Sequence, residues 1–350
     1  MPHIAHLAKP WIPTPPVGYG GIERFLYSLI EAQKHVHEIK LFAPGGSRAP
    51  LPVQLRCLFS ESFERVKGPV SMDVETAQAL HCALTAQNES VDIVHAHSVN
   101  AYLAIAPFLR QKSVFTFYTH PDMAVQRLTQ LAEPYVTFTF VSHQHRRQYP
   151  WIKKASVIHQ GLDLKQFPYT EKKEDYLAFV GTITDKKGIV EAIEISRRCG
   201  MRLLVAAHVK YRDQQFYIEV AKPLMDKSAH VTFLGEVDDR GRNDLLKKAR
   251  AMLFPIKWEE PFGGVMAEAM AVGTPVVAFN RGAVPELVVD AKTGYIVEDI
   301  AQAVKAIRKL DALKPKDCRE HIASNFSIEK SARLFNDLYR TLQGSDSRNL

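Results

Sequence analysis

The chain has 350 residues and a mass of 39.5 kDa, enough for about two domains that each bury a core of their own. Its composition, 46% hydrophobic and 24% charged, is ordinary for a globular protein, and it contains no apolar run of about 18 residues that would span a bilayer. The net charge of +7 is spread over short basic pairs, which disfavours a nucleic-acid partner and leaves only a weak peripheral contact with an anionic membrane.

The beginning of the chain and its cysteines favour a cytoplasmic protein. The residues from Met1 to Trp11 lack the basic start and the cleavable apolar core of a signal peptide, and we interpret them as a first strand. The cysteines are widely spaced without a C-x-x-C motif, so we expect reduced, structural thiols. They are Cys57, Cys82, Cys199 and Cys318.

In the first half of the chain, strand patterns alternate with helix patterns. We expect strands at 4–8, 39–43, 91–95, 113–118 and 136–142, and helices at 22–34, 72–88 and 101–109. The turn-rich stretch 45–67 is expected to be a variable loop. This alternation predicts a parallel sheet that binds ligands at the carboxyl ends of its strands.

A second alternating run follows the polar stretch 169–175, which is the best candidate for a linker. We expect strands at 176–180, 202–206, 231–234, 251–254, 276–279 and 294–297, with helical segments at 188–198, 216–225, 245–249, 265–271, 300–309 and 328–342. The polar end at 344–350 is predicted to be disordered. The fold class is therefore α/β, with two Rossmann-like halves.

A glycine-rich loop, Gly18-Tyr19-Gly20-Gly21, precedes the first helix. Backbone N–H groups at a helix start can face an anion, although a tight turn that needs glycine explains the same residues equally well. The spacing is not G-x-G-x-x-G, and no acidic residue is evident about 20 positions later, so a dinucleotide cofactor is disfavoured.

A second glycine pair, Gly263-Gly264, lies where a loop turns into the helix at 265–271. Free N–H groups and the helix dipole favour a phosphate there. Glu260 and Glu268 bracket this turn, and carboxylates suit the recognition of hydroxyl groups rather than phosphate. The competing interpretation is a helix cap with a solvated glutamate.

Lys187 directly precedes another predicted helix start. The segment from Phe179 to Gly188 has the order strand, loop, helix, so this lysine is well placed as a cation against a diphosphate. A surface lysine pair, Lys186-Lys187, would explain the same residues without any ligand.

Three His-x-His pairs occur in the chain. Residues i and i+2 of a strand share a face and could hold a metal, but no third ligand is marked and no D-x-D motif is present, so we expect no metal. The pair that ends a predicted strand at the ligand edge is the most interesting, and the first pair is expected on a solvated loop. The pairs are His35/His37, His95/His97 and His143/His145.

Several of these motifs together resemble family 4 of the retaining glycosyltransferases. The run E-P-F-G-G-V-M-A-E-A-M-A-V-G-T-P-V-V-A at 260–278 resembles the family's E-x7-E signature. The segment 181–188 resembles its G-R-x-x-x-x-K-G motif, with Thr182 where the family usually has arginine. The resemblance extends from about residue 4 to 342 and is strongest over 176–297.

The resemblance implies the GT-B architecture, in which two Rossmann-like domains face each other across a cleft. Residues 1–168 would form the acceptor-side domain and residues 176–327 the domain that binds a nucleotide-sugar donor. The helix at 328–343 would pack back toward the first domain, and 344–350 would be a disordered tail.

The resemblance also implies roles for single residues. Glu260 would be catalytic together with His120, although a stricter register of the segment 115–121 places Tyr118 at the reacting centre instead. His97 and Tyr118 would lie on the acceptor or sugar side. The donor-binding residues would be Gly20, Gly21, Thr182, Lys187, Gly263, Gly264, Val265 and Glu268.

On this basis we expect a metal-independent retaining hexosyltransferase that uses a nucleotide diphosphate sugar, most simply a UDP-sugar, as co-substrate, without a further cofactor. The acceptor is not identified by the sequence. A sugar-nucleotide epimerase or a phosphorylase on the same fold is an alternative. A non-catalytic protein that binds sugar nucleotides is another, and Thr182 in place of arginine favours it.

Overall fold

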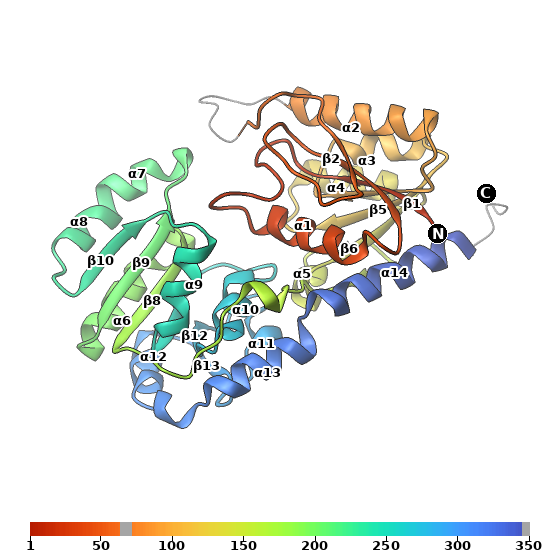
Figure 1. The fold of residues 1–350 in the computed structure, drawn as a ribbon. Helices are drawn as coiled ribbons and strands as arrows, with labels where there is room; N and C mark the ends of the chain where they lie inside the picture. Colours follow the sequence, from red (N-terminus) through yellow and green to blue (C-terminus); the bar gives the residue numbers. More distant parts are fainter. Residues whose placement is uncertain (64–71, 345–350) are drawn as a thin grey trace. The chain divides into compact units, whose positions relative to one another are not determined.

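The computed structural model describes residues 1–63 and 72–344, with the backbone alone at Met72 and Arg212. The chain divides into two compact units, one formed by residues 1–161 and the chain from Ile328 onward, the other by residues 162–327 (Figure 1). Most of the tail predicted at 344–350 lies outside the described residues.

The first unit is built on a parallel sheet with the strand order β3-β2-β1-β4-β5-β6-β7. The strands are β1 (His3–Leu7), β2 (Glu38–Phe42), β3 (Gln54–Arg56), β4 (Ile93–His97), β5 (Lys112–Phe117), β6 (Val136–Phe140) and β7 (Ala155–Val157). Its helices are α1 (Gly21–Gln33), α2 (Met72–Asn88), α3 (Tyr102–Ile105), α4 (Met123–Ala132), α5 (His143–Arg147) and α14 (Ile328–Gly344), with a 3-10 turn η1 at Ala106–Phe108. The alternation expected from the sequence is confirmed, and β4 begins two residues later than expected.

The second unit has a parallel sheet with the order β10-β9-β8-β11-β12-β13. The strands are β8 (Tyr176–Thr182), β9 (Arg202–His208), β10 (Val231–Gly235), β11 (Ala251–Phe254), β12 (Val276–Phe279) and β13 (Gly294–Val297). The α-helices are α6 (Ile189–Cys199), α7 (Gln214–Phe216), α8 (Lys222–Asp226), α9 (Asp239–Lys248), α10 (Gly264–Ala271), α11 (Val284–Leu287), α12 (Ile300–Ile307) and α13 (Pro315–Asn325). Short 3-10 turns occur at Leu164–Gln166, Asp185–Lys187, Tyr211–Asp213 and Leu310–Ala312, and a π-helical turn at Tyr217–Ala221.

Buried apolar strands hold each sheet in place. In the first unit, Phe115, Phe117, Phe138 and Phe140 on β5 and β6 pack as one aromatic cluster, with Phe117 and Phe140 stacked at 4.9 Å between ring centroids. Aromatic pairs of this kind add to the free energy gained from burial alone. Both faces of such central strands are covered, as expected for parallel sheets.

Helix α14 comes last in the sequence and belongs to the first unit. Its Asn336 Oδ1 accepts hydrogen bonds from Gln33 Nε2 at 2.7 Å and from the His37 ring at 2.9 Å, and its Tyr339 is fully buried. The expectation of a solvated loop for His37 is wrong, because this ring is buried where α1 ends and α14 covers it.

The boundary between the units lies earlier than the linker predicted at 169–175. Residues 162–168, which the sequence analysis assigned to the first domain, lie in the second unit. Arg319 Nη1 donates to the Phe167 carbonyl at 2.9 Å, and Asn243 Nδ2 donates to the Gln166 carbonyl at 2.7 Å. These partly buried polar contacts, rather than local composition, decide where the segment packs.

All four cysteines are free thiols, and Cys82 and Cys318 are buried. Across the described residues, every helix is too short or too polar to pass through a lipid bilayer.

Candidate functional site

The candidate donor site is built from loops at the carboxyl edge of the second sheet. Strands β8, β11 and β12 are neighbours in that sheet, and the segments that leave them are 183–188, 255–263 and 280–283. Because all three strands are parallel, these loops meet at one edge, where α/β sheets bind their ligands.

Gly263 starts helix α10 in a left-handed conformation with φ of +81°. A Cβ there would lie 2.6 Å from Met266 Cε, the movable end of a flexible side chain, so it is the positive φ that favours glycine at this position. A Cβ on Gly264 would meet nothing within 4 Å, which leaves open space beside the first N–H groups of the helix. The following residue, Val265, lies in the first turn. The sequence-predicted helix start is confirmed, while its role in phosphate binding stays a prediction.

Glu260 and Lys187 form a direct ion pair. Lys187 Nζ lies 2.5 Å from Glu260 Oε2, and the indole Nε1–H of Trp258 donates to the same oxygen at 2.9 Å. The ammonium groups of Lys186 and Lys187 lie over the Trp258 ring, 5.7 and 5.5 Å from its centroid. The structure thus brings together two residues that the sequence placed at one site, and it adds Trp258, whose role no motif indicated.

Lys187 is fixed by the backbone around it. Thr184 caps the 3-10 turn by accepting from the Lys187 N–H, and Gly188 follows with φ of +76°. A Cβ on Gly188 would lie 1.9 Å from the Pro255 carbonyl oxygen, so the two loops approach each other as closely as glycine allows.

The loop that carries Glu260 is also tied to the segment after β12. Glu259 accepts from the Gly282 N–H at 2.7 Å, and the Glu260 carbonyl accepts from the Ala283 N–H at 2.9 Å. These bonds fix the backbone of the loop from which the Glu260 side chain projects. Glu259 was missed in the sequence, where it reads only as a neighbour of the signature.

Glu268 lies one turn into α10 and is paired with Arg242 of α9. Arg242 Nε is 3.2 Å from Glu268 Oε2, and both side chains are about nine-tenths buried. No sequence signal indicated Arg242.

Thr182 ends β8 and is buried, opposite His208 at the end of β9. His208 Nδ1 lies 2.8 Å from Glu236 Oε2. In this chain the end of β8 therefore carries a hydroxyl where the related motif has a guanidinium.

In the first unit, the glycine loop before α1 is held by Arg24. Its Nη2 donates to the Gly18 carbonyl at 2.7 Å. Gly20 has φ of +147°, and a Cβ on it would lie 2.7 Å from Pro16. A Cβ on Gly21, by contrast, would meet nothing within 4 Å. The turn alone thus explains Gly20, and a role for either glycine in donor binding stays a prediction.

His120 follows β5 on a loop that is held by hydrogen bonds to the carbonyl of the preceding residue, Thr119. The Thr119 carbonyl accepts hydrogen bonds from Tyr149 at 2.6 Å and from the His145 ring at 3.0 Å. His120 itself is half-buried, with its ring 6.0 Å from that of His145. Of the two candidates for the reacting centre, His120 is the more accessible one.

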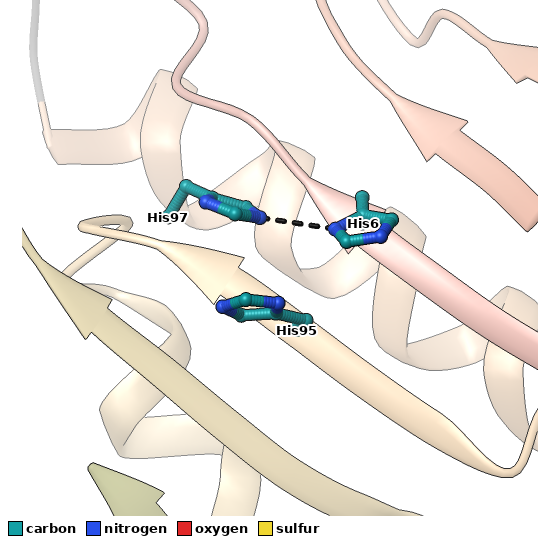
Figure 2. Close-up of side chains that lie close together, drawn as sticks. All are labelled: His6, His95 and His97. Carbon is teal, nitrogen blue, oxygen red and sulfur yellow. Dashed lines mark hydrogen bonds between the residues drawn. The ribbon is translucent and has the colours of Figure 1, made fainter. Parts of the chain in front are cut away.

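His97 and Tyr118 lie in the interior of the first unit. His97 Nδ1 is 2.8 Å from the Tyr118 hydroxyl, and His97 Nε2 is 3.0 Å from His6 Nδ1 (Figure 2). Burial raises the pKa of Tyr118 well above its usual range and lowers that of His97. The two side chains are thus hydrogen-bonded to each other, and their contact with a sugar stays a prediction.

The sequence marked no third ligand beside His95 and His97, but the structure supplies one. His6 on β1 pairs in register with His95 on β4, and the ring nitrogens of His6, His95 and His97 lie within 4.8 Å of one another. Five of these six nitrogens are already hydrogen-bonded. Both ring nitrogens of His95 are among them: one lies 2.6 Å from the Tyr339 hydroxyl and the other 2.7 Å from the Thr116 hydroxyl. A metal would have to displace these bonds, so the trio fits a neutral hydrogen-bonded core better than a metal centre.

The titration behaviour of this buried cluster has a common cause. Removal from water disfavours the charged imidazolium, which lowers the pKa of His6 to about 3 and also lowers that of His95 and His97. At neutral pH the three rings are therefore uncharged.

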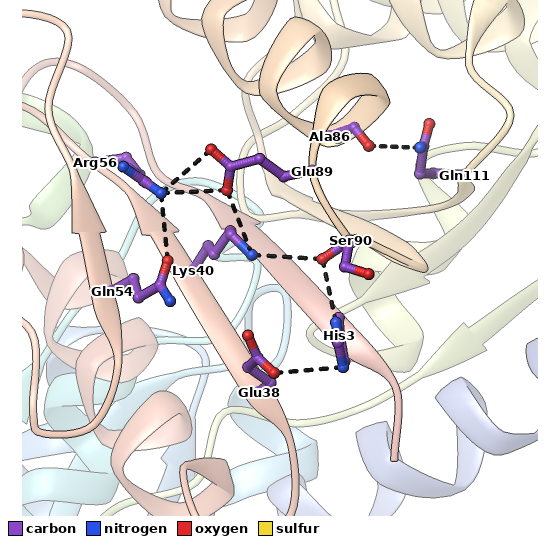
Figure 3. Close-up of polar contacts among 9 residues, drawn as sticks. All are labelled: His3, Glu38, Lys40, Gln54, Arg56, Ala86, Glu89, Ser90 and Gln111. Carbon is purple, nitrogen blue, oxygen red and sulfur yellow. Dashed lines mark hydrogen bonds and ion pairs between the residues drawn. The ribbon is translucent and has the colours of Figure 1, made fainter.

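A second polar cluster lies at the opposite, amino edge of the same sheet (Figure 3). Lys40 is buried, and its Nζ lies 3.5 Å from Glu89 Oε2 and 3.4 Å from the Ser90 carbonyl. Because ligands bind at the carboxyl edges of parallel strands, we assign this cluster to stability rather than to a site.

Two family models match the chain in succession. The one described as "Glycosyltransferase Family 4" matches residues 19–166, and the one described as "Glycosyl transferases group 1" matches residues 163–325. Together they span residues 19–325, which include nearly all of the second unit and leave out the start of the first unit and its helix α14.

Curated relatives match over almost the full length. Phosphatidyl-myo-inositol mannosyltransferase of Mycobacterium tuberculosis is 25% identical over 355 residues, which cover 91% of this chain and 89% of that protein. Spore coat protein SA of Bacillus subtilis is 21% identical over an alignment of 394 positions, gaps included, which covers 96% of this chain and 98% of that protein.

Solved structures share the fold. Sucrose-phosphate synthase of Thermosynechococcus elongatus superposes with a TM-score of 0.84 at 18% identity, covering 99% of this chain and 100% of that one. HepE of Anabaena, solved in complex with UDP and glucose, superposes with a TM-score of 0.76 at 16% identity, covering 97% and 100%. At these identities the likeness establishes the architecture of the chain.

Proposed function

The chain belongs to family 4 of the glycosyltransferases and has the GT-B fold, and on this premise we propose that it moves a hexosyl group from a UDP-sugar to an acceptor, retaining the anomeric configuration and using no metal ion. The observation that carries the proposal is the Lys187–Glu260 pair beside the Gly263-Gly264 helix start. A cation, a carboxylate and a helix N-terminus in one loop cluster match what a sugar diphosphate presents.

Lys187 would stabilise the negative charge of the diphosphate leaving group. Its ammonium group is now paired with a single carboxylate oxygen, and a diphosphate offers it more negative charge than that carboxylate does. The N–H groups at the start of α10 would act on the same phosphates. Preorganised donors of this kind contribute roughly 3–4 kcal/mol each to the stabilisation of a transition state.

Glu260 would bind the sugar of the donor. When Lys187 turns to the diphosphate, the Trp258 indole N–H still holds Glu260 Oε2 in place. The carboxylate is then able to accept hydrogen bonds from sugar hydroxyls near the anomeric carbon, where positive charge develops. Glu268 would bind the ribose of the nucleotide.

The comparisons support the donor class. HepE was solved with UDP and glucose, and a relative of the chain is a mannosyltransferase. Both support a hexose as the transferred sugar, and the first supports UDP as its carrier.

A thermal-shift panel tests the proposal most directly. UDP-, GDP- and ADP-linked glucose, galactose and mannose are added to the protein, and a ligand at 100 times its dissociation constant should add about 2.7 kcal/mol of stability. We expect UDP-sugars to give the largest shift and Glu268→Ala to abolish most of it. Glu320→Gln, which changes an exposed glutamate of α13 in the same unit, is the matched control.

The panel also has outcomes that would contradict the proposal. No shift with any nucleotide sugar would exclude a donor site of this kind. A shift with GDP- or ADP-sugars alone would exclude UDP as the carrier and leave the reaction class standing.

A non-catalytic sugar-nucleotide binding protein is the second candidate, and the observation that favours it is the hydroxyl of Thr182 at the end of β8. Slow release of UDP from the donor in water, or transfer to any member of an acceptor panel, would exclude it. Conversion of the donor to an epimer, or sugar release that requires phosphate, would instead favour an epimerase or a phosphorylase.

A further inference from the structure

Arg242 is an unusual side chain for the surface helix on which it lies. It is in the first turns of α9 and is only 7% exposed, although arginine is rarely buried without a partner. Its Nη1 donates to Asp239 Oδ1 at 2.8 Å, and its guanidinium lies over the Phe167 ring, 5.8 Å from the centroid. These contacts fix the guanidinium on two sides and direct its Nε toward Glu268.

The contact between Arg242 and Glu268 is close but incomplete as a hydrogen bond. Nε lies 3.2 Å from Glu268 Oε2, yet it is buried and has no well-aligned acceptor among the described residues. Arg242 is the only group of the described residues that pairs with the Glu268 carboxylate, whose side chain keeps 11% of its surface exposed. One face of this carboxylate is therefore held, and the remainder can accept further hydrogen bonds.

A structural role alone accounts poorly for the pair. Helix α9 is already attached to its surroundings by Asn243, whose Nδ2 donates to the Gln166 carbonyl. Burying two opposite charges removes both from water, so such a pair adds little net stability compared with apolar side chains. Its more effective contribution is to fix the direction of a carboxylate.

We propose that Arg242 is a positioning residue for Glu268: it holds the carboxylate oriented so that its free oxygen accepts hydrogen bonds from the ribose hydroxyls of the donor. This inference rests on the proposed function. The diphosphate of a donor would repel a lone carboxylate nearby, and the fixed cation at Arg242 offsets that repulsion. A glutamate held by a second group also loses less freedom when the nucleotide binds.

The test compares ribonucleotides with deoxyribonucleotides. Binding of UDP and 2′-deoxy-UDP is measured by calorimetry for the wild type, Arg242→Met and Arg242→Lys, and the pairs ADP/2′-deoxy-ADP and GDP/2′-deoxy-GDP are run in the same way. Since a hydrogen bond to a charged group is worth roughly a tenfold change in affinity or more, we expect the wild type to prefer the ribonucleotide about tenfold. Arg242→Met should lose that preference, with the affinity for the deoxynucleotide nearly unchanged.

The controls separate positioning from folding. Arg250→Met removes another ion-paired arginine of the same unit, bonded to Asp311 at 2.7 Å, and should leave the preference intact. Arg242→Lys should restore part of it by returning the charge. If Arg242→Met melts too low to be measured, Phe167→Leu, which removes the ring beneath the guanidinium, should reduce the preference in a folded protein.

The outcomes are distinct. A wild type that binds no nucleotide overturns the proposed function itself. A wild type that binds ribonucleotide and deoxynucleotide equally overturns the ribose contact of Glu268 and this inference with it. A wild-type preference that survives in both Arg242→Met and Phe167→Leu overturns the role of Arg242 alone, as does an equal loss of affinity for both nucleotides.

Discussion

The carboxyl edges of the two sheets carry polar clusters that differ in what their charges are paired with. In the second unit, Lys187 and Glu260 are partly exposed and form an ion pair with each other. In the first unit, His6, His95 and His97 are buried, uncharged and bonded to neutral hydroxyls or to one another. Lys187 and Glu260 can exchange their mutual ion pair for contacts with a ligand. The three histidines could bind a ligand only by breaking hydrogen bonds that they already make.

This difference teaches that a cluster of chemically active residues is not by itself a site. Ion pairs at a half-open edge gain from a ligand of higher charge, because water already screens their mutual attraction. Buried neutral hydrogen bonds gain nothing from a ligand, and breaking one leaves a desolvated polar atom without a partner. The experiments below test this contrast, beginning with the largest expected effect.

Glu260→Gln should lower kcat about 100- to 1000-fold, because the amide keeps the shape of the side chain and loses the charge that acts near the anomeric carbon. The measurement is steady-state transfer or donor hydrolysis, together with a melting curve that should change little. A variant that retains more than a tenth of wild-type turnover would show that Glu260 is not catalytic.

Acid should destabilise the first unit selectively. The pKa of His6 falls from its ordinary 6.5 to about 3 in the folded protein, so between these values the unfolded chain binds a proton that the folded chain does not. Stability is then complete above pH 6.5 and decreases as the pH falls toward 3, by roughly 1.4 kcal/mol per pH unit for each such histidine.

This effect is measured by urea unfolding between pH 7.5 and 4.5. In a Trp258→Phe background the remaining tryptophans, Trp11 and Trp151, both report on the first unit. His6→Asn should reduce the slope of stability against pH, and His143→Asn, which changes an exposed ring, should not. A slope that is the same in all three proteins would contradict the assignment.

Tyr339→Phe should lower the free energy of unfolding by about 1–3 kcal/mol, because it leaves His95 Nδ1 buried without its partner at 2.6 Å. Chemical denaturation measures the loss, and nucleotide binding should be unchanged. Tyr295→Phe removes a more exposed hydroxyl bond, to the Lys309 carbonyl at 3.1 Å, and should have the smaller effect. Equal losses in the two variants would count against the buried cluster as a stabilising element.

Trp258→Phe should lower kcat about tenfold, since it removes one hydrogen bond to the charged Glu260 and keeps an aromatic ring under the lysines. The KM for the donor should change little. Trp151→Phe, which removes a bond to Thr129 in the first unit, is the control and should leave kcat unchanged. Wild-type turnover in Trp258→Phe would mean that the Lys187 contact alone holds Glu260.

Sequence patterns predicted the strands of the second unit better than those of the first, for a physical reason. Strands β11, β12 and β13 have the expected bounds, because each is a short apolar run closed by proline, glycine or a polar turn. Strand β3 has only three residues, all at least partly exposed, so its hydrogen bonds to β2 leave no apolar pattern. Helix α4 was missed although Asp122 caps it by accepting from the Val125 N–H, a signal that the sequence does offer.

The candidate site divides in the same way. Glu260, Gly263, Gly264 and Glu268 are close in sequence, so one helix start brings them together and a motif can reveal them. Arg242 reaches Glu268 only because α9 packs on α10, which no local pattern indicates. The position of His6 could be predicted in part, because the β1–β4 pairing that brings it to His95 follows from the strand order of a Rossmann-like sheet.

The return of α14 to the first unit has a consequence for how the chain matures. A ribosome makes residues 1–161 first, but the helix that covers His37 and bonds to His95 emerges only after the whole of residues 162–327. The first unit therefore waits through the synthesis of the second with the rings of His37 and His95 uncovered. Closure of that core therefore has to follow the synthesis of residues 162–327, and a nascent chain halted before Ile328 would lack the helix that completes it.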